Sequence, residues 1–267
     1  MAKTCVLRTD GTNCDRETKH ALELVGGEAE IIHLNTLVRG YDPATERKVK
    51  LGDYASLVIP GGFSAGDYIA AGKIFACDLE HFLGEELREF VKAGKPILGI
   101  CNGFQVLVKL GLLPGLDGKV QQTATLTYNN NQRFECRWVH LAKPDGDKCI
   151  WTRDIDKIDL PVAHGEGKFV APEDLCERLF SEAQVVFQYT DSTGKPTQDY
   201  PANPNSSMYA IAGICDPTGL IFGLMPHPER YNSPMNHPLA TLQRIKGELP
   251  QKGLGLKIFE NGVGFSG

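Results

Sequence analysis

The first part of the chain alternates short apolar runs with longer segments in which apolar residues recur every three or four positions. The short runs predict buried strands at residues 5–7, 28–34, 56–60 and 96–100. The longer segments predict helices at residues 14–25 and 79–93, which end at Gly26 and Gly94. Buried strands that alternate with helices are typical of a parallel sheet with helices on both faces.

After Gly118 the pattern changes to alternation with a period of two. Over residues 123–141, apolar and polar residues alternate on either side of three consecutive asparagines at 129–131. Phe134, Cys136 and Trp138 then fall on one face. This pattern predicts an antiparallel hairpin. Further strands are predicted at residues 185–189, 210–215 and 220–225.

These elements predict one α/β domain over residues 1–246. We expect an open, mostly parallel, doubly wound sheet with antiparallel additions. Residues 190–207 are rich in Pro, Asn, Ser and Asp and predict an irregular loop. Residues 247–267 are rich in glycine without clear periodicity, so we expect a C-terminal tail there.

Charge and composition exclude several classes of partner. Lys and Arg number 28 against 33 Asp and Glu, which gives a formal net charge of −5. Nucleic acid or an anionic membrane as the main partner requires clustered positive charge, so we expect neither. No apolar run has the roughly 20 residues that a transmembrane helix needs.

The eight cysteines form no CxxC pair and no spacing typical of zinc ligands, so we expect no metal site. The N-terminus lacks the long apolar stretch of a signal peptide. We therefore expect reduced, mostly buried cysteines and a cytoplasmic protein.

Cys101 differs from the other cysteines because of its neighbours. The run Gly-Ile-Cys-Asn-Gly at residues 99–103 joins a predicted strand to a predicted helix and matches the G-x-S-x-G elbow, with Cys in place of Ser. Such an elbow presents its side chain at the carboxyl edge of the sheet. The helix dipole is expected to lower the pKa of this thiol. Because the motif is short, a buried cysteine at a strand end is the alternative.

A candidate base for this thiol lies in the run Met-Pro-His-Pro-Glu-Arg at residues 225–230, after the last apolar strand. The two prolines hold the segment extended, so His227 and Glu229 project in similar directions. A carboxylate bonded to one imidazole nitrogen leaves the other nitrogen to face a thiol. An ordinary surface loop is the alternative reading of this run.

A third candidate segment is the glycine turn Pro-Gly-Gly-Phe-Ser-Ala-Gly-Asp at residues 60–67. At the end of a parallel strand, such a turn is able to aim backbone N–H groups at a developing oxyanion. A phosphate-binding loop is the rival interpretation, but the run lacks the GxxxxGK[ST] spacing.

In this order, the three segments resemble those of the class I (triad) glutamine amidotransferases, which have a flavodoxin-like fold. The resemblance extends to the glutaminase subunits of phosphoribosylformylglycinamidine synthase. It rests on the runs Gly-Thr-Asn-Cys-Asp at 11–15, the glycine turn through Tyr68, Gly-Ile-Cys-Asn-Gly-Phe-Gln at 99–105, His-Gly-Glu-Gly-Lys-Phe at 164–169, Ala-Gly-Ile at 212–214 and Met-Pro-His-Pro-Glu-Arg at 225–230.

The resemblance implies catalytic roles for three residues. Cys101 attacks the side-chain amide of glutamine, His227 transfers protons, and Glu229 orients His227. The implied oxyanion donors and substrate contacts are Gly62 or Phe63, Asn102 and Gln105. For His164, a site role and a structural role both remain open.

The resemblance also implies that ammonia passes to a large ATP-dependent synthetase subunit, which makes formylglycinamidine ribonucleotide in purine biosynthesis. A small accessory subunit is expected in the same complex. No cofactor is expected in this chain, because ATP and Mg²⁺ belong to the synthetase. The alternatives are a glutaminase of another pathway, a stand-alone cysteine hydrolase, and a binding protein with Cys101 as a redox sensor.

Overall fold

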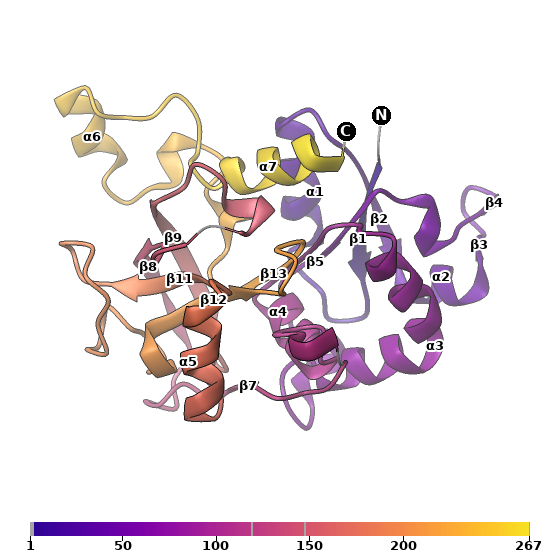
Figure 1. The fold of residues 1–267 in the computed structure, drawn as a ribbon. Helices are drawn as coiled ribbons and strands as arrows, with labels where there is room; N and C mark the ends of the chain where they lie inside the picture. The colour runs from indigo at the N-terminus through magenta and orange to yellow at the C-terminus, as the bar shows by residue number, and fades with distance from the viewer. Residues whose placement is uncertain (1–2, 119, 147, 267) are drawn as a thin grey trace.

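The computed structural model describes residues 3–118, 120–146 and 148–266. Nine strands of these residues form one large sheet, in the order β2-β1-β5-β6-β13-β12-β11-β8-β9 (Figure 1). The sheet divides into a parallel half and an antiparallel half, which meet at β13.

The parallel half contains the strands that the apolar runs predict. Its members are β1 (Lys3–Arg8), β2 (Glu28–His33), β5 (Ser56–Ile59), β6 (Ile97–Ile100) and β13 (Ile221–Leu224). Every residue of β5, β6 and β13 is buried, as expected for strands that helices cover on both faces.

Helices pack on both faces of this half (Figure 1). One face carries α1 (Asp15–Leu24) and α7 (Leu256–Ser266), and the other carries α2 (Leu34–Arg39), α3 (Lys73–Lys92) and α4 (Asn102–Lys109). Helix α3 begins before residue 79, where the apolar pattern placed its start. The predicted α/β class, with a doubly wound parallel sheet and antiparallel additions, is confirmed.

The antiparallel half is built from β12 (Ile211–Cys215), β11 (Val185–Thr190), β8 (Glu135–Ala142) and β9 (Lys157–His164). Helix α5 (Glu173–Ser181) precedes β11, and α6 (Ala240–Lys246) follows the last strand. Two small sheets pair β7 (Thr125–Thr127) with β10 (Lys168–Val170) and β3 (Tyr41–Asp42) with β4 (Arg47–Lys48).

The hairpin predicted over residues 123–141 is wrong. Strand β7 pairs with β10, whereas β8 pairs with β9 and β11, so the two halves of the supposed hairpin lie in different sheets. The faces also differ from the expectation, because Glu135 is buried while Phe134 and Cys136 are exposed. An ion pair with Arg137 compensates the buried carboxylate, which a count of apolar positions does not detect.

The residues expected as a Gly-rich tail include helix α7. Its residues Leu256, Ile258 and Phe259 are buried in the core, and the helix packs on α1 (Figure 1). Glycines interrupt the apolar spacing of this segment, so the helix is formed by its tertiary contacts rather than by its periodicity. Among the described residues, every helix is too short or too polar to span a lipid bilayer.

Candidate active site

Three segments meet at the carboxyl edge of the parallel half. Strand β5 runs into the glycine turn, β6 into Cys101, and β13 into the segment that carries His227 and Glu229. Because these three strands are neighbours in the sheet, segments far apart in the sequence are brought together at one edge.

Cys101 occupies a strained elbow between β6 and α4. Its φ of 52° and ψ of −104° lie outside the helical and extended regions. A Cβ atom on Gly103 would lie 1.9 Å from the carbonyl oxygen of Ile59, so this close approach requires glycine. The backbone therefore has the strand–turn–helix form that the GxCxG motif predicts.

The surroundings of Cys101 correct the expectation of a lowered thiol pKa. The residue is buried, and burial raises the pKa of its thiol well above the ordinary value. Cys14 and Glu229 act in the same direction, while Arg230 and the backbone of Asn102 oppose them. The thiol is therefore neutral at rest, and forming the thiolate requires a nearby base.

His227 and Glu229 form a buried pair that suits this need. His227 Nδ1 and Glu229 Oε1 are 2.6 Å apart, and the two side chains are 1% and 0% exposed. The backbone N–H of His227 donates to the carbonyl of Pro161 in β9, which fixes the segment to the antiparallel half. Among the described residues, the buried Nε2 of His227 has no hydrogen-bond partner. A base with one nitrogen anchored and the other unpaired is ready to accept a proton.

Gly61 shows how closely the base and the thiol approach. A Cβ atom on Gly61 would lie 2.8 Å from His227 Cε1 and 3.4 Å from Cys101 Cβ. The imidazole and the thiol-bearing carbon thus border the same small space, beside the glycine turn. The structure brings together Cys101, His227 and Glu229, the three residues that the sequence singled out as a triad.

The two candidate oxyanion donors in the glycine turn differ in their surroundings. The N–H of Phe63 donates to the carbonyl of Gly11 at 2.9 Å, so it is already engaged. The N–H of Asn102, the first residue of α4, interacts with the Cys101 thiol, and among the described residues no partner is found for the N–H of Gly62. This geometry favours Gly62 and Asn102 over Phe63 as donors.

A cavity of about 170 Å³ opens beside Cys101. Its lining includes Gln105, the carboxylates of Asp67 and Glu166, and the aromatic rings of Phe63, Tyr128 and Phe134. Gln105 Nε2 donates to the carbonyl of Glu166 at 2.5 Å, and Asn102 Nδ2 donates to Asp67 Oδ1 at 3.0 Å. Burial raises the pKa of Asp67, with a smaller contribution from Glu166.

Sequence reasoning missed several residues that lie at this site. Cys14 Sγ accepts a hydrogen bond from Arg230 at 3.1 Å, and burial raises the pKa of the Cys14 thiol to about 12. The only sequence signal for Cys14 is its place in the Gly-Thr-Asn-Cys-Asp run. Asp67 and Glu166 likewise lie inside runs that carry the resemblance, but their side chains had no assigned role.

Donor atoms of Cys14, His227 and Glu229 lie within 4.8 Å of one another. Sulfur, nitrogen and oxygen donors at this separation are able to hold a soft divalent cation. The guanidinium of Arg230 already supplies positive charge to Cys14, and Glu229 is bonded to His227. The cluster therefore consists of two members of the candidate triad, His227 and Glu229, beside a Cys14 thiol that is paired with Arg230.

Known proteins resemble this chain along its whole length. The family model for the CobB/CobQ-like glutamine amidotransferase domain matches residues 1–266. A protein from Dehalococcoides mccartyi, named phosphoribosylformylglycinamidine synthase subunit PurQ, is 46% identical over 261 residues, which cover 98% of this chain and 96% of that protein. A protein of the same name from Methanococcus maripaludis is 42% identical and covers 98% of this chain and 97% of its own.

A solved structure is similar to the fold over the same length. A chain in the structure of PurLQS from Thermotoga maritima aligns with a TM-score of 0.70 and 31% identity. The match covers 99% of this chain and 98% of that one.

Proposed function

The chain belongs to the CobB/CobQ-like glutamine amidotransferase domain family, and we propose that it is the glutaminase subunit of a phosphoribosylformylglycinamidine synthase. The observation that carries this proposal is the buried His227–Glu229 pair beside the strained elbow of Cys101. The near full-length similarity to the two named synthase subunits supports purine biosynthesis as the pathway.

The first half of the reaction forms a thioester. His227 Nε2 takes the proton of the Cys101 thiol while Sγ adds to the side-chain amide carbon of glutamine. The N–H groups of Gly62 and Asn102 stabilise the negative oxygen of the tetrahedral intermediate. The carbon–nitrogen bond then breaks, and His227 returns its proton to the leaving nitrogen, which departs as ammonia.

The second half of the reaction releases glutamate. His227 Nε2 takes a proton from water, and the resulting hydroxide adds to the thioester carbon. The carbon–sulfur bond breaks, and the thiolate of Cys101 regains the proton from His227. Glu229 holds the imidazole in one orientation and stabilises its positive charge in both halves.

Two carboxylates in the cavity support glutamine as the substrate. Asp67 and Glu166 line the space beside Cys101, so their carboxylates are suited to pair with the α-ammonium group of the substrate. Gln105 lines the same cavity, where its Nε2 donates to the carbonyl of Glu166 and its Oε1 accepts from Asn102 Nδ2, so it helps to shape the site.

The partner and the location follow from the proposed reaction. The ammonia is used by a large synthetase subunit that binds ATP and Mg²⁺, with a small accessory subunit in the same complex, as the PurLQS structure supports. The proposal assigns no cofactor to this chain, since the triad needs none. We place the protein in the cytoplasm, where its eight unpaired cysteines remain reduced.

A stand-alone cysteine hydrolase is the strongest rival, because it would use the same triad. The cavity of about 170 Å³ favours a single amino acid over a larger peptide substrate. A redox-sensing role for Cys101 does not explain the unpaired Nε2 of His227 or the two carboxylates that line the cavity.

The deciding experiment compares glutamine turnover by the isolated chain with turnover in the presence of the synthetase, ATP and the ribonucleotide. We expect slow hydrolysis by the chain alone and a large increase in the complex, with amidine formed for each glutamine consumed. Equal rates in both conditions would favour the stand-alone hydrolase.

A further inference from the structure

Residues 163–166 line one side of the cavity, and residues 163–167 run from the end of β9 to the start of β10; we refer to residues 163–167 as the wall segment. Two side chains of the opposite half contact its backbone. The Cys101 thiol points at the carbonyl of Ala163 at 3.7 Å, and Gln105 Nε2 donates to the carbonyl of Glu166. The shape of the glutamine site therefore depends on what holds this segment.

Asn129 holds the wall segment at both of its ends. Its Oδ1 accepts from the N–H of Gly167 at 3.0 Å and lies 3.0 Å from His164 Nδ1. Its Nδ2 donates to the carbonyls of His164 and Arg133, each at 2.8 Å, and its backbone N–H donates to the carbonyl of Gly165. Only 1% of Asn129 is exposed, so these bonds are made without competition from water.

His164 is the partner of Asn129 rather than a proton carrier. Because Asn129 Oδ1 only accepts, Nδ1 of His164 must carry the hydrogen. Its Nε2 faces Asn205 Nδ2 at 3.5 Å, a weaker contact. Burial, together with the charge of His227, lowers the pKa of His164 to about 3, so the ring stays neutral at working pH.

Gly167 shows how tightly the ring is enclosed. A Cβ atom on Gly167 would lie 2.5 Å from both Cε1 and Nδ1 of His164. The imidazole is thus fixed between Asn129 on one side and the backbone of the wall segment on the other.

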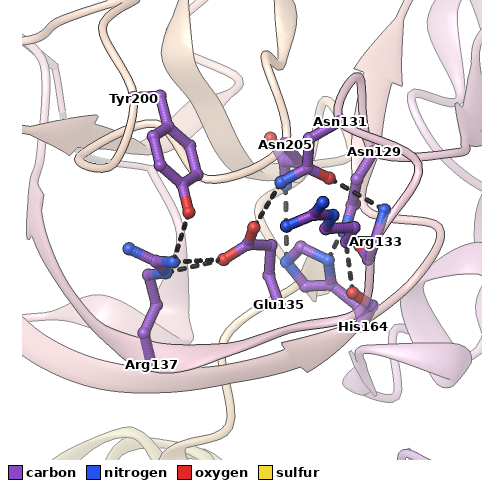
Figure 2. Close-up of polar contacts among 8 residues, drawn as sticks. All are labelled: Asn129, Asn131, Arg133, Glu135, Arg137, His164, Tyr200 and Asn205. Carbon is purple, nitrogen blue, oxygen red and sulfur yellow. Dashed lines mark hydrogen bonds and ion pairs between the residues drawn. The ribbon is translucent and has the colours of Figure 1, made fainter.

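The outer end of this network reaches the surface (Figure 2). Asn131 Nδ2 donates to the buried carboxylate of Glu135, which pairs with Arg137, and Arg137 donates to the hydroxyl of Tyr200 at 2.6 Å. Glu135 lies directly opposite His164 in the register of β8 and β9. The turn that carries Asn129 is therefore anchored on both sides.

From these contacts we infer that Asn129 is the positioning residue that holds the wall segment in the shape required to bind glutamine. This inference rests on the proposed function, since it names what shapes that same site. The hydrogen bonds of Asn129 to the wall segment reach His164, Gly165 and Gly167 but not Ala163, which contacts the Cys101 thiol, so we expect Asn129 to act on substrate binding rather than on the nucleophile.

The test compares two neighbouring asparagines in the full chain assembled with its synthetase. Asn129→Ala removes the buried network, whereas Asn130→Ala removes an exposed side chain whose one hydrogen bond within the described part of the chain is with Lys168. We expect the first variant to raise the KM for glutamine and lower kcat/KM about 10–100-fold, and the second to leave both unchanged.

A readout besides turnover separates positioning from general damage. In Asn129→Ala, alkylation of Cys101 by iodoacetamide should stay within about twofold of the parent, because Asn129 makes no bond to Ala163, the wall residue that contacts the thiol, and this small reagent does not fill the glutamine site. Alkylation by a glutamine-like chloroketone should slow in parallel with kcat/KM. Equal slowing with both reagents would overturn the inference.

A second pair of variants covers the case in which Asn129→Ala does not fold. His164→Asn places an amide donor where Nδ1 lies and keeps the bond to Asn129, whereas His164→Gln places its amide near Nε2. We expect His164→Asn to retain most of kcat/KM and His164→Gln to lose about as much as Asn129→Ala. Equal activity in both would contradict the inference, while activity retained by Cys101→Ala would instead refute the proposed function.

Discussion

The two halves of the large sheet contribute to the site in different ways. The parallel half supplies the candidate reacting groups, because β5, β6 and β13 end at one edge, where the glycine turn, Cys101 and His227 follow them. The antiparallel half supplies the wall segment and the carbonyl of Pro161, which holds His227 through its backbone. Different strands therefore position the candidate reacting groups and the wall of the cavity.

The forces that fix the two sides of the cavity also differ. In the parallel half, glycines permit close backbone approach. A methyl group on Gly61 would lie 2.8 Å from His227 Cε1, and one on Gly103 would lie 1.9 Å from the carbonyl oxygen of Ile59, so neither position has room for it. In the antiparallel half, buried amide hydrogen bonds of Asn129 and Asn205 hold the chain. We expect changes in the first half to act on the chemical step and changes in the second half to act on glutamine binding.

The largest effect should come from Cys101→Ala, which removes the nucleophile and little packing. Glutamine hydrolysis should fall at least about 10⁴-fold. The measurement is glutamate formation, together with a melting curve that should match that of the parent. Cys77→Ala, at an exposed position on α3, is the control and should keep full activity. Substantial activity in Cys101→Ala would refute the triad.

Substitutions of the base and of its orienting carboxylate should have the next largest effects on glutamine hydrolysis. His227→Ala should match Cys101→Ala, whereas Glu229→Gln should cost less, about 10²–10⁴-fold in kcat, because the imidazole remains but loses its buried charge partner. Steady-state kinetics of the three variants gives the ranking. An unchanged rate in Glu229→Gln would remove Glu229 from the mechanism.

Gly61→Ala tests the close approach within the parallel half. The added methyl would lie 2.8 Å from His227 Cε1, so the imidazole must move, and kcat should fall about 10²-fold. Gly52→Ala is the matched control, since its Cβ would contact nothing within 4 Å. If both variants keep the parent kcat, the spacing between thiol and base does not limit the reaction.

The pH dependence of stability tests the buried, neutral His164 in the antiparallel half. Its folded pKa of about 3 lies below that of an unfolded histidine, so the unfolded chain binds the extra proton as the pH falls below about 6.5. The free energy of unfolding should decrease toward low pH, by up to about 1.4 kcal/mol per pH unit from this group. His164→Asn should show a shallower slope between pH 6 and pH 4 in urea titrations. Identical slopes would show that His164 titrates alike in both states.

The smallest effect concerns α7, which packs on the parallel half. A Cβ atom on Gly262 would lie 2.0 Å from the buried ring of Trp151, so Gly262→Ala should destabilise the fold by about 1–3 kcal/mol. Gly264→Ala is the matched control, because its Cβ would meet nothing within 4 Å and alanine favours the helix. Urea unfolding of both variants measures the difference. Equal stability would argue that α7 is not an integral part of the domain.

The parallel half and its candidate triad could be read from the sequence because their signals are local. Short apolar runs define β5, β6 and β13, and parallel strands place the residues that follow them at a common edge. The glycines around Cys101 encode the elbow within five residues. The order of these segments therefore predicts that Cys101, His227 and Glu229 lie together at one edge of the sheet.

The antiparallel half could not be read in the same way. The alternation over residues 123–141 predicts strands there, but the partners of β7 and β8 are chosen by contacts with β9, β10 and β11, which no local rule supplies. The asparagine run looked like a turn, and its role in holding the wall depends on which of three identical side chains is buried.

The sequence by itself determined the class of the fold and singled out the candidate nucleophile, base and carboxylate, because each depends on spacing along the chain. Only the tertiary structure decided the protonation of Cys101, since burial outweighs the helix dipole, and only it brought Cys14 against Arg230 and Asn129 against the wall segment. Burial and long-range hydrogen bonds arise from the packing of distant segments, so their energies are set when the chain folds.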